Sequence, residues 1–214
     1  RYGHRVERTA VLSWRWRRHI RWGDDTSPIE VVRRLMAVRG WPARVPALAV
    51  GVRTGEPAEE EIASALSDGA LVRSYAFRGG SYVFAPEVAA DLLAVRTITR
   101  IWQTDRWQRQ AAIEVQDWEP VREGVRAALA DGPRTRAEIA DHLRRDPATR
   151  SVADAAASGA GADTLYKPLH WWGDICFGPE RDGTTTFRRL DGHPHRPGAV
   201  DPDEAGPRAV RAYL

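Results

Sequence analysis

The segment best suited to contact a charged polymer is a block rich in arginine and tryptophan at residues 14–22. It reads Trp-Arg-Trp-Arg-Arg-His-Ile-Arg-Trp and contains no acidic residue. Guanidinium groups bind phosphates, and an exposed indole stacks on a base or wedges beside it. The alternative is a solvated arginine face with the tryptophans packed in the core. The first interpretation predicts DNA contacts by Trp14, Arg15, Arg17, Arg18 and Arg21.

Two further arginines are predicted to contact DNA. Arg78 stands in an Arg-Gly-Gly turn, and Arg136 begins a helix that Thr135 is expected to cap. Arg134, Arg144 and Arg145 flank the same helix and would face DNA with it. A scaffold helix with solvated arginines is the alternative.

The remaining reactive side chains are interpreted as structural. Cys176 is the single cysteine, which excludes a disulfide framework and a cysteine-based zinc finger; it is expected to be a buried thiol. His193 and His195 lie in a Pro-rich segment and are interpreted as spacer rather than as a metal pair. Asp24 and Asp25 are interpreted as loop or capping acids, with a water-holding carboxylate as the alternative. We predict no metal and no cofactor.

Composition is that of an ordinary globular chain. The 214 residues are 43% hydrophobic and 29% charged, with a net charge of +3, so overall charge argues only weakly for nucleic acid. Lys167 is the one lysine among 32 basic residues. No run approaches the ~20 apolar residues of a membrane span, and no secretory signal is visible. These features predict a cytoplasmic protein of one or two small domains.

The arginine block is predicted to lie on a helix at 10–22. At 100° per residue, Leu12, Trp16 and Ile20 share one face, which we expect to be buried. Arg17 and Arg21 lie on the opposite face, which would meet DNA.

The first half continues with helices and one hairpin. Ser27, Pro28 and Glu30 are a helix-start signal for a helix to about Val38, and a further helix is predicted at 57–67. Two β-prone runs, 70–76 and 81–85, flank the Arg-Gly-Gly turn. A helix from Pro86 to about Thr99 follows.

The second half has stronger signals, in the order typical of a winged helix. Helices are predicted at 118–130, from Thr135 onward and at 163–172, followed by strands at 174–178 and 185–190 around an Asp-Gly turn. The expected core comprises Ile139, Leu143, Leu165, Leu169 and Phe177.

We therefore predict an α+β fold, mostly α-helical, of tandem winged-helix modules. The first module, 10–99, carries the hairpin at about 70–85, and the second, 100–191, has its wing at 174–190. Residues 192–207 are rich in proline and glycine and predict a linker, and helix-like residues 208–214 predict the start of a truncated third module.

The sequence resembles the winged-helix proteins of the AlkZ/YcaQ crosslink-repair DNA glycosylase family. Four segments carry the resemblance over roughly residues 10–191: Leu12 to Arg18, Ser27 to Leu35, Leu71-Val72-Arg73 with Phe77-Arg78-Gly79, and Lys167 to Thr186-Phe187, which includes Trp172-Gly173-Asp174 and Cys176-Phe177-Gly178-Pro179. The resemblance implies DNA as the partner.

The chain departs from the family at the catalytic motif. The family's Gln-apolar-Gln (or Gln-apolar-Asp) falls on Arg39-Gly40-Trp41. Hydrolysis of the base–sugar bond needs acceptors that hold a water, whereas guanidinium and indole only donate. Gln108-Arg109-Gln110 has the right spacing but lies in another helix, and we interpret it as coincidence. The hairpin also differs, with Gly80 and Tyr82 where the family often has Thr and His.

Three functions follow as hypotheses. The first is a DNA-binding protein without competent glycosylase chemistry, acting on duplex DNA and favouring distorted or alkylated sites. The second is a monofunctional glycosylase that excises alkylated purines, in DNA repair or in self-protection against a DNA-alkylating metabolite, with Asp24, Asp25 or another group holding the water. The third is a small-molecule or protein-binding module on the same fold.

Overall fold

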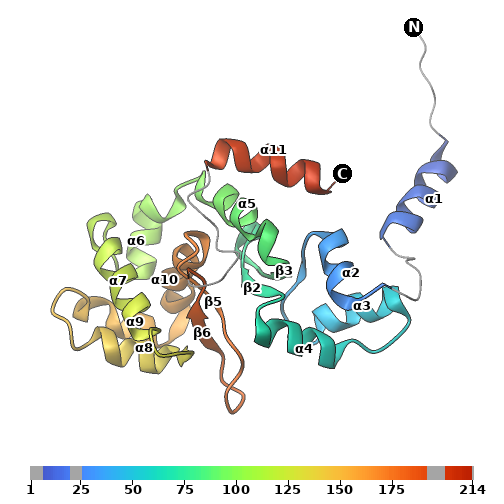
Figure 1. Ribbon diagram of the computed structural model, residues 1–214. Helices are drawn as coiled ribbons and strands as arrows, with labels where there is room; N and C mark the ends of the chain where they lie inside the picture. Colours follow the sequence, from blue (N-terminus) through green and yellow to red (C-terminus); the bar gives the residue numbers. More distant parts are fainter. Residues whose placement is uncertain (1–6, 20–25, 192–200, 214) are drawn as a thin grey trace, which may run out of the picture.

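The computed structural model describes residues 7–19, 26–191 and 201–213. The chain is mostly helical with two three-stranded antiparallel sheets, which confirms the predicted α+β class (Figure 1). No helix in the described part of the chain has both the length and the apolar character needed to cross a membrane.

The first part of the chain places helices around a small sheet. Its helices are α1 (Arg8–His19), α2 (Pro28–Leu35), α3 (Val45–Thr54), α4 (Glu59–Asp68) and α5 (Pro86–Thr97). Its strands are β1 (Val38–Arg39), β2 (Val72–Tyr75) and β3 (Ser81–Phe84). The predicted hairpin is confirmed, since β2 pairs antiparallel with β3.

Strand β1 and helix α3 were not predicted. Helix α2 ends at Leu35, earlier than the predicted Val38, because Met36 takes a positive φ of 68° and turns the chain toward the sheet. Val38 then pairs with Val83 in β3. At Gly40 a Cβ would lie 3.1 Å from backbone atoms of Ser81 and Tyr82, so a larger residue would crowd this approach.

The second part has the predicted order of helices and hairpin. Its elements are α6 (Asp105–Ala111), α7 (Trp118–Ala128), β4 (Arg134–Thr135), α8 (Arg136–Leu143), α9 (Ala153–Ala157), α10 (Gly159–Trp171), β5 (Ile175–Phe177) and β6 (Thr186–Arg189). Short 3-10 turns lie at Ile101–Gln103, Val115–Asp117 and Arg150–Val152, and another, Phe77–Gly79, forms the turn of the first hairpin. Thr135 and Glu138 form the predicted capping box.

The predicted core of this part is largely confirmed. Ile139, Leu143, Leu165 and Leu169 are fully buried in one cluster. Phe177 packs against that cluster but is only half-buried. It therefore lies at the edge of the core, with one side open to the site described below.

The two sheets lie beside each other and join the two parts of the chain. Edge strand β2 of the first sheet contacts edge strand β5 of the second. Cys176 in β5 is buried, as predicted, in a cluster with Val72 and Phe84. Arg188 in β6 donates hydrogen bonds of 2.9 and 3.0 Å to the last carbonyls of α4. These contacts connect the two parts of the chain.

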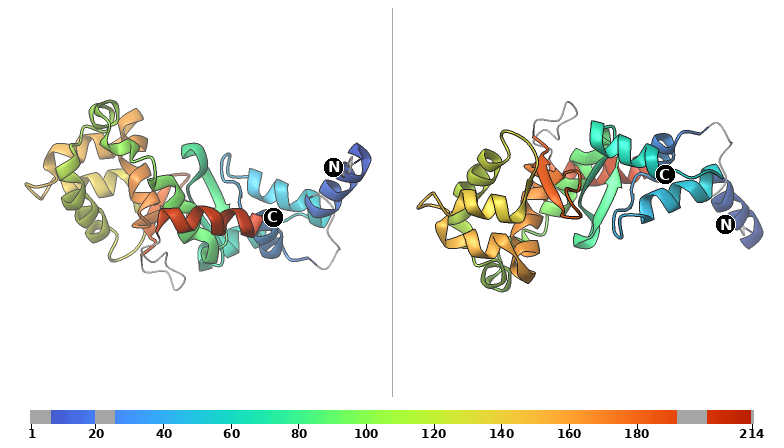
Figure 2. Two further views of the ribbon diagram at one scale, coloured as in Figure 1. Left: turned by 90° about the horizontal axis from the view of Figure 1, so that it is seen from above. Right: turned by 90° about the horizontal axis from the view of Figure 1, so that it is seen from below.

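The predicted linker and C-terminal segment need correction. Helix α11 runs from Pro202 to Tyr213 rather than starting at residue 208, and it lies along α5 (Figure 2). Arg208 forms an ion pair of 2.7 Å with Asp91 on α5, and Ala205 is fully buried. This segment therefore packs onto the first part instead of extending away from it.

The predicted phase of the N-terminal helix is wrong. Leu12 and Trp16, expected to be buried, are 53% and 55% exposed, and α1 stands at the end of the molecule, away from the main body (Figure 1). Helical periodicity defines a face, but only a neighbouring element can bury it. Ile20 and Arg21 lie outside the described residues, so the proposed division into a buried face and a DNA face has no support.

Candidate nucleic-acid interface

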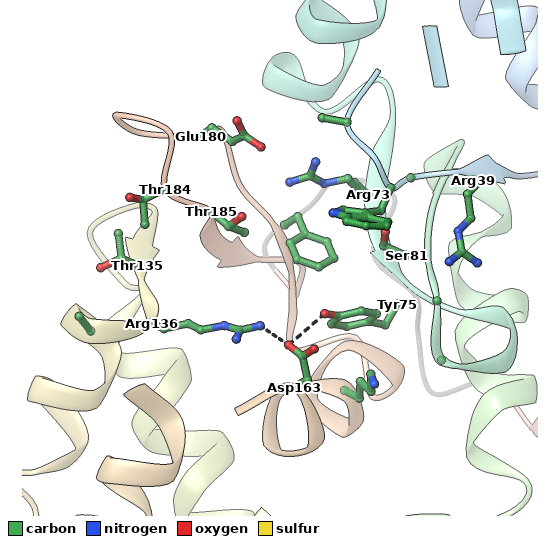
Figure 3. Close-up of a pocket in the computed structure, with 18 of the residues that line it drawn as sticks. Arg39, Arg73, Tyr75, Ser81, Thr135, Arg136, Asp163, Glu180, Thr184 and Thr185 are labelled. Atoms are coloured by element: carbon green, nitrogen blue, oxygen red, sulfur yellow. Dashed lines mark hydrogen bonds and ion pairs between the residues drawn. The ribbon is translucent and has the colours of Figure 1, made fainter. Parts of the chain in front are cut away.

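A cleft of about 770 Å³ lies between the two parts of the chain, with walls from both sheets (Figure 3). Charged and aromatic side chains dominate its lining. They are Arg39 and Trp41 from β1 and the residues after it, Arg73 and Tyr75 from β2, Arg136 from α8, Asp163 and Lys167 from α10, and Phe177 and Glu180 from the second hairpin.

Arg39 and Trp41, the residues onto which the family motif is predicted to fall, both line this cleft. Arg39 ends β1, where its guanidinium carbon lies 5.6 Å from the centre of the Tyr82 ring. Trp41 follows directly and is 68% exposed. Tyr82, in the β2–β3 hairpin, stands where the family often has histidine. Arg39 and Tyr82, two residues that differ from the expected family pattern, therefore contact each other.

A carboxylate that the sequence did not reveal lies on the α10 wall. Asp163 forms an ion pair with Arg136, and its Oδ1 accepts a hydrogen bond of 3.3 Å from the Tyr75 hydroxyl. Burial and the neighbouring Asp163 carboxylate raise the pKa of Tyr75 to about 12. Tyr75 is therefore a hydrogen-bond donor rather than a base at neutral pH.

Arg73 is held against the second hairpin. Its guanidinium carbon lies 4.7 Å from the centre of the Phe177 ring. Burial lowers the pKa of Arg73, and the nearby Glu180 carboxylate opposes that shift. Because Phe177 comes from the other part of the chain, this contact joins the two walls of the cleft.

Lys167 is the second residue that sequence reasoning missed as a site residue. Its ammonium lies 5.4 Å from the centre of the Tyr75 ring, and the side chain is half-buried. Among the described residues it forms no ion pair. The sequence signal was available: it is the one lysine in the chain.

The charges in the cleft favour an anionic ligand. Four cations, Arg39, Arg73, Arg136 and Lys167, face two carboxylates, Asp163 and Glu180. Within the described ranges no three His, Cys, Asp or Glu side chains form a metal-binding group. The cleft therefore offers phosphate-binding donors and aromatic surfaces.

A second, more apolar hollow of about 340 Å³ adjoins the first. Ala47, Ile62 and Leu66 line it, and it shares Arg73, Phe177 and Glu180 with the main cleft. The pair of hollows has room for an extended ligand with an anionic part and an apolar part.

A buried histidine lies behind the aromatic wall. The Ser74 hydroxyl and the Nδ1 atom of His170 are 2.8 Å apart, and both side chains are fully buried. Burial, with Arg136 and Arg73 nearby, holds the pKa of His170 well below its usual value. The imidazole contacts the Tyr75 and Phe177 rings, each with centroids 4.9 Å away, and so positions two residues of the cleft.

The structure brings together only some of the predicted site residues. Arg136 lines the cleft with Arg39 and Trp41, whereas Arg78 is exposed at the tip of the hairpin with φ of 51°. Gln108 and Arg109 line a separate hollow on α6, which agrees with their interpretation as coincidence.

The arginine block lies apart from this cleft. On α1, Trp14, Arg15 and Arg17 are exposed, and Arg18 belongs to the same helix. Arg21, Asp24, Asp25, His193 and His195 lie outside the described residues.

Known proteins give the same assignment as the motifs. A family model for AlkZ-like DNA glycosylases matches residues 32–214. An interstrand DNA cross-link repair glycosylase from Streptomyces sahachiroi is 29% identical over 211 residues, which are 95% of this chain and 55% of that protein. The solved structure of Streptomyces sahachiroi DNA glycosylase AlkZ is similar with a TM-score of 0.84 and 27% identity, over 95% of this chain and 55% of that one. This chain therefore spans about half the length of both relatives, and it belongs to the AlkZ-like DNA glycosylase family.

Proposed function

We propose that this chain binds duplex DNA through the cleft and lacks the water-activating chemistry of an active glycosylase. The observation that carries the proposal is the placement of Arg39 and Trp41 in a cationic, aromatic cleft. Neither side chain has an acceptor that could take a proton from water. Both suit binding, because a guanidinium pairs with phosphate and an exposed indole stacks on a base.

The remaining contacts belong to the same proposal. The second part of the chain would act as a winged helix, with the start of α8 near the backbone of the DNA, where Arg136 is paired with Asp163. Arg78 would reach a phosphate from the hairpin tip, and Trp14, Arg15, Arg17, Arg18 and Arg21 would extend the contact beyond the cleft. Distorted or alkylated DNA would be favoured, because an opened base step gives Trp41 a surface on which to stack.

A binding titration with parallel measurement of base release tests this proposal. The probes are plain duplex, N7-methylated duplex and single-stranded DNA, each at two salt concentrations. We expect salt-dependent duplex binding with negligible release of N7-methylguanine. Base release at the rate of an active relative would contradict the proposal, and absence of both binding and release would favour a module that binds another ligand.

The second candidate is an active glycosylase that uses Asp163. This carboxylate lines the same cleft as the two motif positions and could hold a water. Arg136 and Tyr75 both donate to its Oδ1, which leaves fewer acceptor sites for a water. If base release is observed, Asp163→Asn should abolish it, with Glu180→Gln as the matched control from the rim of the cleft.

A further inference from the structure

We propose that Lys167 captures abasic DNA by forming an imine with the aldehyde of the base-free sugar. The inference rests on the proposed DNA binding in the cleft and extends it to a specific form of DNA. Removal of a base leaves a sugar whose ring-opened form carries an aldehyde at C1′. A primary amine in the binding site is the group that reacts with it.

The first support is the identity of the residue. The chain has 32 basic residues, and Lys167 alone is a lysine. Arginine serves equally well or better wherever the task is to pair with a phosphate. A guanidinium cannot form an imine with an aldehyde under these conditions, because it stays protonated. The one basic side chain capable of this chemistry therefore lies in the cleft.

The second support is the position of the amine. Lys167 lies on the α10 wall four residues after Asp163, so the two side chains share one face of the helix. Its Nζ is 5.4 Å from the Tyr75 ring centre, and its Cε would lie 3.9 Å from a Cβ on Gly79, in the turn of the first hairpin. The amine thus stands between α10 and the hairpin, held by packing and, among the described residues, by no ion pair.

The third support is the set of groups around it. Arg39 and Arg73 supply donors for the two phosphates that flank an abasic sugar, and Trp41 at 68% exposure can occupy the stacking space that the missing base leaves. An abasic site needs no base pocket with hydrogen-bonding groups, and it presents the aldehyde where a base would otherwise block it. The cleft therefore fits base-free DNA better than intact DNA.

The step balances without a further reactant. The ammonium releases a proton to solvent, and the free amine adds to C1′ to form a C–N bond. Loss of one water from the resulting carbinolamine gives the imine. Addition of water reverses the reaction and returns the lysine, so the capture is reversible and no oxidant or reductant takes part.

Reductive trapping tests the inference. The whole protein is incubated with a duplex oligonucleotide that carries one abasic site, in the presence of sodium cyanoborohydride, and the covalent adduct is located by proteolysis and mass spectrometry. We expect an adduct on Lys167. A duplex whose abasic sugar has been reduced to the C1′ alcohol should bind without forming an adduct. An adduct found only on the amine at the start of the chain, or no adduct at all, would overturn the inference.

Two variants separate the chemistry from the binding. Lys167→Arg keeps the positive charge and should lose the adduct while salt-dependent binding of duplex DNA is still detected. Adding Arg109→Lys to that variant places a lysine in a separate hollow on α6 and should not restore the adduct. If the wild-type protein binds duplex but gives no adduct, the inference alone fails; if it binds no DNA, the proposed function fails first. Because the adduct is mapped on the wild-type protein, the result does not depend on how either variant folds.

Discussion

The two sheets have the same strand order, but the arginine next to the first strand has different contacts in each. In each sheet a two-residue strand pairs with the second strand of a hairpin, giving β1-β3-β2 and β4-β6-β5. Arg39 ends β1 and Arg136 directly follows β4, and both line the cleft. Arg136 is ion-paired with Asp163 and lies against the Tyr166 ring. Arg39 faces the Tyr82 ring and, within the described ranges, forms no ion pair.

The comparison distinguishes a guanidinium that is paired within the fold from one whose donors are available to the proposed ligand. A guanidinium that is already satisfied by a carboxylate has little to gain from a phosphate. A guanidinium that faces an aromatic ring and solvent keeps its donors for a ligand. A similar contrast exists between two ion pairs: Asp174 in the second part is buried with two arginine partners, whereas Arg33 and Glu87 in the first part pair at the surface.

The largest expected effect is a loss of stability when the buried carboxylate of Asp174 in the second part is removed. Asp174 has a side chain only 4% exposed and pairs with Arg122 at 2.7 Å and Arg126 at 2.8 Å. Asp174→Asn should lower the free energy of unfolding by about 3–5 kcal/mol, because two partly buried guanidinium groups lose their buried carboxylate and keep the exposed Glu119. Urea denaturation measures the change.

An ion pair in the first part is the matched control. Arg33 and Glu87 are 48% and 45% exposed, so Glu87→Gln should cost less than about 1 kcal/mol. Equal losses of unfolding free energy for Asp174→Asn and Glu87→Gln would contradict the contrast between the two parts.

The next effect is a pH dependence of the free energy of unfolding, caused by His170. The imidazole of His170 has a pKa well below its usual value in the folded protein, so it is neutral there. Above about pH 6.5 the unfolded chain is neutral at this position too. Below that pH the unfolded chain takes up a proton that the folded protein does not, and the free energy of unfolding should fall by up to ~1.4 kcal/mol per pH unit until the folded pKa is reached.

The variant His170→Gln checks the assignment of this pH dependence. It removes the titrating group, so its stability should change less between pH 6.5 and pH 5 than that of the wild-type protein. Parallel pH profiles for the two proteins would show that other groups cause the acid sensitivity.

A smaller effect is expected on the salt dependence of DNA affinity when Arg39 or Arg136 is replaced. Arg39→Ala should flatten the plot of log DNA affinity against log salt by about 0.9, the contribution of one phosphate contact. Arg136→Ala should leave that slope nearly unchanged, because its guanidinium already binds Asp163. Equal flattening by both variants would show that Arg136 also contacts phosphate, as the sequence predicted.

The smallest effect is expected on α1. Since Trp16 is 55% exposed, Trp16→Ala should change the free energy of unfolding by less than about 0.5 kcal/mol. Thermal or urea denaturation checks this value. A loss of several kcal/mol would mean that another surface covers this helix in solution.

Local signals allowed much of the fold to be predicted from the sequence. The caps at Ser27 and Thr135 and the turn glycines Gly79 and Gly183 were all identified from residues within four positions of one another. The assignment of the family motif to Arg39 and Trp41 rests on counting from a well-marked helix and stays a prediction. Strands β1 and β4 were missed, since two residues carry no periodicity and a strand of that length exists only through its partner.

The cleft itself was not predictable in the same way. Asp163 and Lys167 lie on α10 and meet Tyr75 from the first hairpin, 88 residues away in sequence for Asp163. Nothing within a few residues of either marks it as a site residue, apart from the rarity of lysine. The prediction that Leu12 and Trp16 are buried on α1 was wrong for the same reason. An apolar helix face is buried only if an element distant in sequence covers it.

By itself, the sequence determined the helix and turn boundaries that depend on near neighbours, and the family; it also predicted that Arg39 and Trp41 replace the acceptor motif. The tertiary structure alone decided that β2 and β5 lie edge to edge, that α11 returns to α5, and that Arg136 is paired whereas Arg39 is not. Caps, turns and periodicity arise from interactions a few residues apart, which a sequence displays. Ion pairing, burial and the shape of a cleft arise from residues that meet only after the chain has folded.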